Sequence, residues 1–524
     1  MYIRNKISIL ISFLIFVLSL VSPYCCFADE FEFATAKDFQ LGKIFNDNMV
    51  FQQNEPIRIW GTSDDEGGII NARIGEASGY SKVKNGKWEI SFASRIYSNE
   101  PFTVEIFGGE GCRYETIENA RVGDVWWIIG QSNIEYSSSC SGYWETFKEQ
   151  LTGNENIRLL DLDINQFNAD NNIRWRNLNR FSAADASALA CFTMKNLDSS
   201  FAGEVPLAAV ISGYSGKEIA SFMPSELTED FSAIKDESDI YDATIKHFVR
   251  MPVKGIIWYQ GEADASQYSE YSDKLSSYIE WLRKKKNQEN KDFPVYAVEL
   301  SPCFNDINDP NRQFLDFGII RGEMGALCAK LENFYVCPTS DTWSERGFSN
   351  NLHPDNKQNI AMRLSNMILA KEYGFGDYRT YAGPMLKKYE LSDDEKCATL
   401  TFDANLVCDN FEGFKIIGKN WDLINNVDFL VSDNILKITS DREICIVRYN
   451  VDTENVFGET IFLSSQNGQP APGFAVEFST PKNPVNYVRA YIKPVMWICG
   501  AGIIIVFGVV LFFVIKAKNK KKQG

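Results

Sequence analysis

The 524-residue sequence contains only two histidines, His247 and His353. A histidine that acts as a general base must therefore be one of these two. The chain has no CxxC pair and no Cys/His cluster with the spacing of zinc ligands, so we expect no metal site. It also has no Asn-x-Ser/Thr acceptor, which favours a host or compartment without N-glycosylation. The net charge of −16 would repel a phosphate backbone, so we expect no nucleic-acid partner.

The two ends of the chain predict a single-pass membrane protein. A basic start and an apolar run precede small residues, so residues 1–28 are predicted to be a signal peptide cleaved near Ala28, with an uncleaved anchor as the alternative. Residues 495–515 carry no charge and are long enough for a transmembrane helix. The lysine-rich tail, residues 516–524, should then be cytoplasmic, and the bulk of the protein extracellular or lumenal. A dilysine retrieval signal is a second interpretation of the last residues, and we prefer a stop-transfer tail.

The twelve cysteines give no readable disulfide pattern. Three of them, Cys25, Cys26 and Cys499, lie in the two predicted terminal segments. The remaining cysteines are odd in number, so at least one stays free or pairs between chains. Disulfides are compatible with an extracytoplasmic location, but their connectivity and the oligomeric state stay open.

Between the two ends, the pattern of apolar and polar residues changes twice along the sequence. Short apolar runs separated by Gly, Asp and Asn predict a β module at residues 29–120. Strand-like and helical stretches alternate over residues 121–380, which predicts an α/β domain with a parallel sheet. Short strands return at residues 381–485 and predict a second β module.

The first candidate site residue is Ser132. It follows the apolar run DVWWIIGQ, where a buried strand would turn into a helix. Ligands of open α/β folds bind at the carboxyl ends of the strands, and the N–H of such a serine could stabilise an oxyanion. The sequence is not a GxSxG elbow, and an ordinary cap or turn serine is the alternative interpretation.

His353 is the better candidate for a base. It lies in NNLHP, a late loop that precedes a helix predicted to begin near Asp355, whose carboxylate would then cap that helix. Such a loop can carry a base to a serine on another strand. His247 lies within a predicted helix and is interpreted as structural or exposed.

Two more loops follow apolar strands. Gln260 and Glu262 lie in WYQGE, where the glutamine or the following glycine N–H could donate to an oxyanion, and Glu262 could bind substrate or order the loop. Gly216 lies in SGYSGK, where a glycine would let the backbone approach a ligand. Each loop is equally compatible with an ordinary strand end, and together they are stronger evidence than any one.

These motifs resemble those of the sialate O-acetylesterase family of SGNH hydrolases. GDVWWIIGQSNIE, VKGIIWYQGEADA and NLHPDNKQNIAMRL are similar to three blocks of that family, in the same order. FNDNMVFQQNEPIRIWG resembles its amino-terminal β module, and FEGFKIIG, VRYNV and NGQPAPGF resemble its carboxyl-terminal module. The resemblance implies a three-layer α/β domain with a central parallel sheet, flanked by two β modules.

The resemblance also implies site roles. Ser132 would be the nucleophile and His353 the base, with Ser132 N–H, the Gly216 backbone and Gln260 as oxyanion donors. No metal or organic cofactor is implied. Arg321 lies in IIRGE, where the family often has LREAQ. It would contact substrate or pack within the fold.

One residue departs from the family pattern. SGNH hydrolases usually carry an aspartate three residues before the histidine, and this position is Asn350. Loss of the acid from a Ser-His-Asp triad can cost about 10⁴ in rate. Three interpretations remain: a slower Ser-His dyad, an acid supplied from elsewhere such as Asp341, or a degenerate site.

The sequence therefore predicts an extracytoplasmic serine esterase that removes O-acetyl groups from sialic acids or related glycans. An esterase acting on acetylated polysaccharide of the xylan type is an alternative, because the same chemistry serves any exposed acetyl ester. A catalytically decayed, membrane-tethered carbohydrate-binding protein on the same scaffold is the other alternative.

Overall fold

The computed structural model describes residues 35–481 with internal gaps. The gaps are residues 110, 154–155, 166–172, 230, 232–237, 287, 289–290, 302–316, 342–351, 356, 409 and 452–462, together with the side chains of 266–269. The predicted signal peptide, transmembrane helix and basic tail, and also Asn350, lie outside the described residues. Within the described ranges, no helix has the length and apolar character needed to cross a membrane.

The chain divides into two compact units. The described part of the first unit comprises residues 35–42, 58–92 and 104–116, and the second comprises 43–57, 93–103 and the chain from 117 onward. In the first unit, β4 (Ile69–Ile74) pairs with β5 (Ala77–Lys82) in antiparallel fashion. Alternating burial along its strands is typical of a sheet with one covered face.

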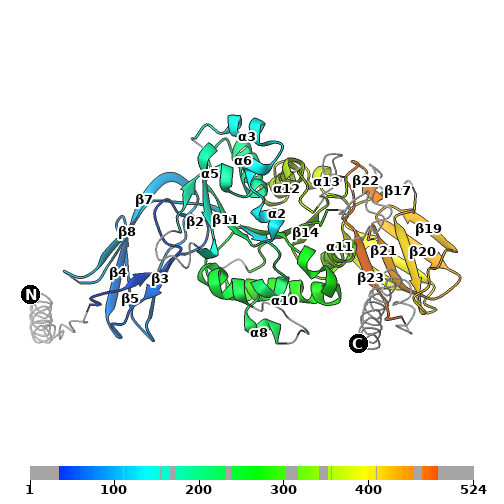
Figure 1. Cartoon of the computed structure of the whole chain (residues 1–524), viewed down its shortest axis with the longest axis horizontal. Helices are drawn as coiled ribbons and strands as arrows, with labels where there is room; N and C mark the ends of the chain where they lie inside the picture. Colours follow the sequence, from blue (N-terminus) through cyan, green and yellow to red (C-terminus); the bar gives the residue numbers. More distant parts are fainter. Residues whose placement is uncertain are drawn as a thin grey trace, which may run out of the picture. The chain divides into compact units, whose positions relative to one another are not determined.

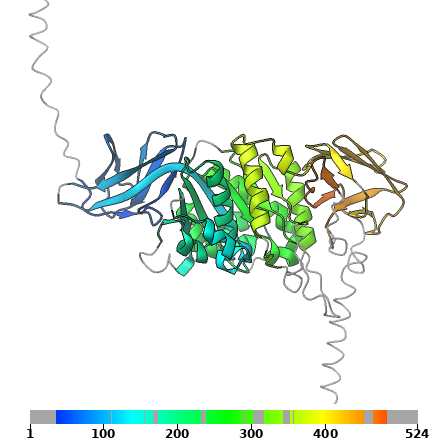
Figure 2. The ribbon, with the colours of Figure 1, turned by 90° about the horizontal axis from the view of Figure 1, so that it is seen from above.

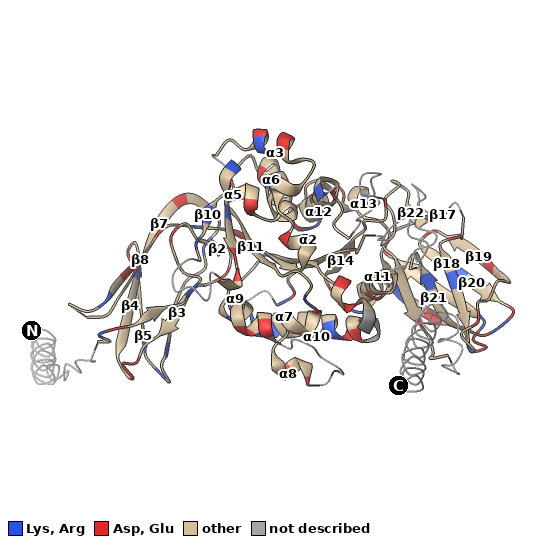
Figure 3. Cartoon of the chain, in the orientation of Figure 1, with Lys and Arg blue, Asp and Glu red and all other residues tan. Residues whose placement is uncertain are grey.

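The second unit contains the predicted parallel sheet. Its central strand is β8 (Tyr114–Gly130), which crosses the predicted domain boundary at residue 120. The strand order is β9 (Ile157–Asp161), β11 (Leu207–Gly213), β8, β12 (Gly255–Tyr259), β13 (Val295–Val298) and β14 (Phe334–Cys337), and these neighbours run parallel. The strands β11 to β14 carry no charged residue (Figure 3), as expected for strands covered on both faces. The prediction of a mixed α/β protein with several sheets is confirmed.

Helices cover both faces of this sheet (Figure 1). α6 (Ala188–Ser200) and α12 (Lys357–Glu372) pack together on one face, and α10 (Tyr271–Lys285) lies on the other. The buried residues of α10 include Leu275, Tyr278, Ile279 and Leu282, which recur at helical spacing. This apolar stripe is what attaches an amphipathic helix to a sheet.

The strand order places a switch point at β8. After β8 the chain forms β9 and β11 on one side, and then crosses to form β12 on the other side. A crevice at the carboxyl ends of the strands is expected at such a point. The strand ends are close there, because a Cβ on Gly130 would lie 1.9 Å from the carbonyl oxygen of Tyr259. Only glycine fits at that position.

The carboxyl-terminal β module packs on the α/β domain through α11 (Phe317–Ala326). Cβ atoms on Gly318 and Gly325 would lie 1.4 and 1.8 Å from the carbonyl oxygens of Val451 and Gly473. The glycines therefore let the module's backbone approach the helix directly. Figure 2 shows the module, in yellow to orange, beside the helices of the α/β domain.

Two sheets of the module contribute to one apolar core. The four-stranded sheet consists of β15 (Leu386–Leu391), β16 (Cys397–Phe402), β20 (Ile435–Ser440) and β19 (Val427–Ser432). The three-stranded sheet consists of β18 (Phe414–Gly418), β21 (Ile444–Tyr449) and β23 (Phe474–Glu477). Aromatic side chains of the two sheets contact one another in this core, because the ring of Phe474 packs against those of Phe402 and Phe414.

Candidate active site

Three of the predicted loops meet at the carboxyl edge of the sheet. Ser132 begins α2 (Ser132–Glu135) two residues after β8. Gly216 follows β11, and Gln260 follows β12. Because β11 and β12 both pair with β8 in parallel, their loops lie on either side of the Ser132 turn. The sequence prediction that these motifs gather at strand ends is therefore confirmed.

Asn133 joins the serine turn to the histidine loop. Its Nδ2 donates to the carbonyl oxygen of Leu352 (2.9 Å) and to Glu262 Oε1 (2.5 Å). Its Oδ1 accepts from Lys357 Nζ (2.6 Å). Since Ser132 precedes Asn133 and His353 follows Leu352, these bonds hold the segment of the predicted nucleophile beside the segment of the predicted base.

The described part of the histidine loop, residues 352–355, is held from several sides. Lys357 Nζ donates to the carbonyl oxygen of Pro354 (2.9 Å). The imidazole of His353 stacks on Tyr136, with ring centroids 6.4 Å apart and planes inclined by 27°. The loop conformation is therefore fixed by groups of the serine side and of α12.

Asp355 completes this attachment. Its Oδ1 accepts from the backbone N–H of Gly142 (2.6 Å) and from the hydroxyl of Tyr136 (3.3 Å). The sequence predicts that this carboxylate caps the helix that follows it. The structure instead shows it bound to the segment that follows the nucleophile turn, two residues before α12 begins.

Burial shifts the pKa values of three ionisable groups at this site, Glu262, Lys357 and His353. Burial raises the pKa of Glu262 to about 7, and burial lowers the pKa of Lys357 to about 7. The pKa of His353 is lowered by burial and by the positive charge of Lys357. Its Nε2 is buried and has no hydrogen-bond partner within the described part of the chain. A neutral imidazole with a free ring nitrogen suits a general base.

Gln260 is engaged on the other side of the site. Its Nε2 donates to the carbonyl oxygen of Lys217 (3.1 Å) and to the carboxylate of Asp264. Asp264 Oδ2 also accepts from Ile219 N–H (2.9 Å), and burial raises the pKa of Asp264 to about 7. Gln260 thus ties the loop after β12 to the loop after β11, and both its N–H groups have acceptors. Its role as an oxyanion donor stays a prediction.

Gly216 is exposed and has a backbone φ of +70°. A Cβ at this residue would meet no atom within 4 Å, so the space beside its backbone is open. Glycine favours this left-handed conformation, and its backbone is accessible to a ligand. The predicted oxyanion role of Gly216 is compatible with this geometry.

The two residues predicted to contact substrate differ in their surroundings. Glu262 accepts from Asn133, so its carboxylate orders the loop, which was one of the two interpretations of this residue. Arg321 lies in α11, is completely buried, and donates to the carbonyl oxygen of Leu300 (3.4 Å). These contacts favour the packing interpretation of Arg321.

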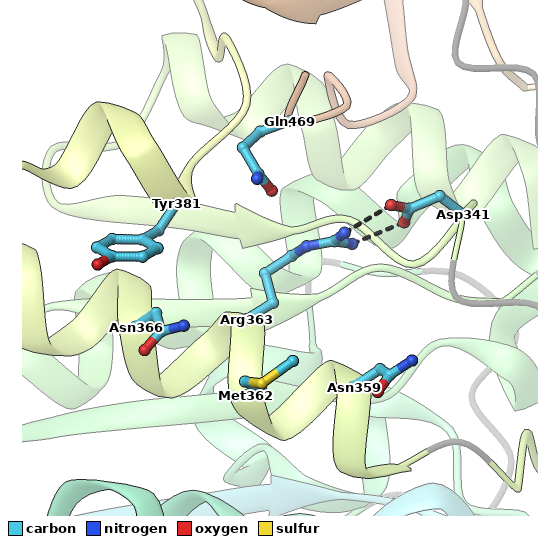
Figure 4. Close-up of a pocket in the computed structure, with 7 residues that line it drawn as sticks. All are labelled: Asp341, Asn359, Met362, Arg363, Asn366, Tyr381 and Gln469. Carbon is cyan, nitrogen blue, oxygen red and sulfur yellow. Dashed lines mark hydrogen bonds and ion pairs between the residues drawn. The ribbon is translucent and has the colours of Figure 1, made fainter. Parts of the chain in front are cut away.

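Asp341, the candidate substitute acid, is already paired. Both of its carboxylate oxygens accept from Arg363 on α12, at 2.7 and 2.6 Å (Figure 4). The pair lines a cavity of about 260 Å³, together with Asn359, Met362, Asn366, Tyr381 and Gln469. Within the described residues, no carboxylate forms a hydrogen bond with His353. Asn350 lies outside them.

His247, the second histidine, lies in α9 (Lys246–Phe248) and not at the edge where the three loops meet. Burial and the charges of Lys246 and Lys43 lower its pKa to about 4. Among the described residues, no group of three or more His, Cys, Asp and Glu side chains could hold a metal ion.

Sequence reasoning did not single out Asn133 and Lys357. Both residues stand inside the motifs that carried the family resemblance, GQSN and HPDNK. Their connection spans 224 residues and depends on the strand order, so no local pattern shows it.

Comparison with known proteins shows a similarity to carbohydrate esterases. Residues 122–342 match the model of the family described as carbohydrate esterase, sialic acid-specific acetylesterase. The chain is similar to the sialate O-acetylesterases of Homo sapiens (23% identical) and Pongo abelii (22% identical), in each case over 440 residues that cover 74% of this chain and 80% of the relative.

The fold is similar to that of a solved carbohydrate acetylesterase from Xanthomonas citri. The TM-score is 0.66, the identity is 20%, and the match covers 84% of this chain and all of that one. Both the family resemblance and the prediction of a carboxylic ester hydrolase are confirmed. Residues 122–342 therefore resemble the sialic acid-specific acetylesterases among the carbohydrate esterases.

Proposed function

We propose that the protein is a serine esterase that removes O-acetyl groups from sialic acids or related acetylated glycans. The observation that carries the proposal is the bond from Asn133 to the carbonyl oxygen of Leu352, which joins the turn of Ser132 to the loop of His353. The names of the human and orangutan relatives support sialic acid as the substrate.

The reaction follows from the two side chains. The Ser132 hydroxyl attacks the acetyl carbonyl while His353 Nε2 takes its proton. The resulting oxyanion would be held by the N–H groups of Ser132 and Gly216. The bond from the acetyl carbon to the sugar oxygen then breaks, His353 gives its proton to that oxygen so that the sugar leaves as an alcohol, and the acetyl group stays on Ser132. Water, deprotonated by His353, releases acetate and restores the enzyme.

The proposal includes the location expected from the sequence. A cleaved signal peptide at residues 1–28 and a transmembrane helix at 495–515 would place the esterase outside the cytoplasm, anchored to a membrane. Two alternatives keep the same scaffold: an esterase for acetylated polysaccharide, and a decayed carbohydrate-binding protein, which the asparagine at position 350 favours.

Acetate release by the purified full-length protein tests the proposal. We expect release from O-acetylated sialic acid, and a loss of at least about 10³-fold in Ser132→Ala. Ser139→Ala, which changes an exposed serine of the same segment, is the matched control and should release acetate like the wild type.

Each outcome has a distinct meaning. Release from acetylated xylan but not from sialic acid would favour the polysaccharide esterase. No release from either substrate by folded wild-type protein or by Asn350→Asp, with glycan binding intact, would favour the binding protein.

A further inference from the structure

Lys357 is a fully buried cation with two protein acceptors. It donates to Asn133 Oδ1 (2.6 Å) and to the carbonyl oxygen of Pro354 (2.9 Å). Its ammonium also lies over the rings of Tyr136 (5.0 Å) and Tyr259 (5.7 Å). A buried charge needs such compensation. Here the compensating groups come from the serine turn, the base loop and the end of β12.

These acceptors lie next to the two reacting residues. Asn133 follows Ser132, and Pro354 follows His353. One ammonium group therefore bonds to both immediate neighbours and fixes the separation of the nucleophile turn from the base loop. In a Ser-His-Asp triad, the aspartate holds the imidazole in its productive orientation. At this site, the described contacts of the base loop come from Lys357, Asn133 and Tyr136, and from Ser141 and Gly142 of the segment after the serine turn.

We infer that Lys357 is a positioning residue of the esterase, which locks the His353 loop onto the Ser132 turn through Asn133 and so performs the orienting task of the aspartate missing at position 350. The inference rests on the proposed function. It explains how an SGNH-type site stays assembled with an asparagine three residues before its histidine.

A second buried lysine provides a matched comparison. Lys286 is also completely buried, donates to the carbonyl oxygen of Met251 (2.8 Å), and lies 4.4 Å from the ring centroid of Trp127. Burial lowers the pKa of both lysines. Among the described residues, the hydrogen bonds of Lys286 Nζ go to carbonyl oxygens outside the site, at Val249 and Met251. The two lysines thus share burial and carbonyl bonding, and differ in their attachment to the site.

Because Lys357 carries a charge near His353, the inference predicts a change in the pH dependence of kcat/KM. A purely structural role of Lys357 predicts no such change. The ionisable groups around His353 are Lys357 on α12, Glu262 after β12, Tyr136 after α2, and Asp355 on its own loop. Of these, the cation lowers the pKa of His353, whereas carboxylates would raise it. Loss of the cation therefore raises the pKa of the base. The acid limb of kcat/KM, where the base becomes protonated, then moves to higher pH.

The test compares Lys357→Met, Lys357→Arg and Lys286→Met in the full-length protein with O-acetylated sialic acid. Misplacement of a catalytic group by about 1 Å can cost about 10²-fold, so we expect Lys357→Met to lower kcat about 10²-fold with KM changed less than threefold. Its acid limb should move to higher pH. Lys357→Arg should keep the limb in place and restore part of kcat. Lys286→Met should lower the melting temperature and leave kcat and the limb unchanged.

The inference is overturned if Lys357→Met keeps kcat within threefold of the wild type. It is also overturned if the limb does not move, or if Lys286→Met loses kcat to the same extent. If Lys357→Met does not fold, Lys357→Gln replaces it, because glutamine removes the charge but keeps a hydrogen-bond donor. The acid limb of kcat/KM in Lys357→Gln must then move to higher pH. Failure of the proposed function is distinguishable, because wild-type protein would then release no Ser132-dependent acetate before any lysine is changed.

Discussion

Two polar clusters attach α12 to the rest of the α/β domain, and they are built differently. In the first, Arg363 pairs directly with Asp341, with two short bonds between fixed partners. In the second, Lys357 reaches Glu262 only through the amide of Asn133, which accepts from the lysine and donates to the carboxylate. The first cluster joins two chain segments, whereas the second joins three loops and includes the neighbours of both proposed catalytic residues.

This difference assigns the two clusters different roles: the first stabilises the fold, and the second positions the catalytic residues. In a bidentate Arg–carboxylate pair, the two side chains satisfy each other through two parallel hydrogen bonds. An asparagine between two charges has a second donor bond left, and Asn133 uses it for the carbonyl oxygen of Leu352. We therefore expect damage to the second cluster to appear chiefly in catalysis, and damage to the first to appear chiefly in the free energy of unfolding.

Among changes to the two clusters, the largest effect is expected for Asn133→Ala. This change leaves Lys357 without one acceptor, and Glu262 and Leu352 without a donor, so kcat for acetate release should fall about 10²-fold. Steady-state kinetics on O-acetylated sialic acid measure the loss.

Asn196→Ala is the matched control for this change. The side chain of Asn196 donates to Ser365 Oγ of α12 at 3.2 Å, away from the base loop. A loss of kcat in Asn196→Ala equal to that in Asn133→Ala would show that any weakening of α12 suffices, and would break the comparison.

A smaller effect, and of a different kind, is expected for Asp341→Asn. Arg363 keeps its bond to the carbonyl oxygen of Pro338 (2.6 Å) but loses its carboxylate, which should lower the free energy of unfolding by about 2 kcal/mol. Acetate release should change less than threefold. Chemical denaturation and steady-state kinetics on the same preparation measure the two quantities. If Asp341→Asn instead loses about 10⁴ in rate with little loss of stability, Asp341 is the missing acid.

Much of this site could be predicted from the sequence, because strand ends leave local patterns. The apolar runs before Ser132, Gly216 and Gln260 predicted buried strands, and parallel strands place such loops at one edge of a sheet. The scarcity of histidine limited the candidate base to His353 or His247. Each of these inferences depends on a chain segment of about ten residues. The structure places the three strand-end loops together at one edge of the sheet.

The rest could not be predicted, because it depends on pairings between distant segments. Lys357 has the sequence context of an ordinary first-turn helix residue, and only the fold shows that it is buried against Asn133. Asp355 had the position of a helix cap, but its carboxylate binds Gly142 N–H. Similarly, β8 continues without interruption across residue 120, where the change in residue pattern predicts a boundary between the first β module and the α/β domain.

The most direct test of the central claim is covalent labelling of the folded protein with a fluorophosphonate, followed by mass spectrometry of its peptides. Such a reagent reacts with a serine hydroxyl that a neighbouring base activates. We predict a single adduct on Ser132 in the wild-type protein, and no adduct in His353→Ala. An adduct on another serine, or labelling of Ser132 that persists in His353→Ala, would contradict the account.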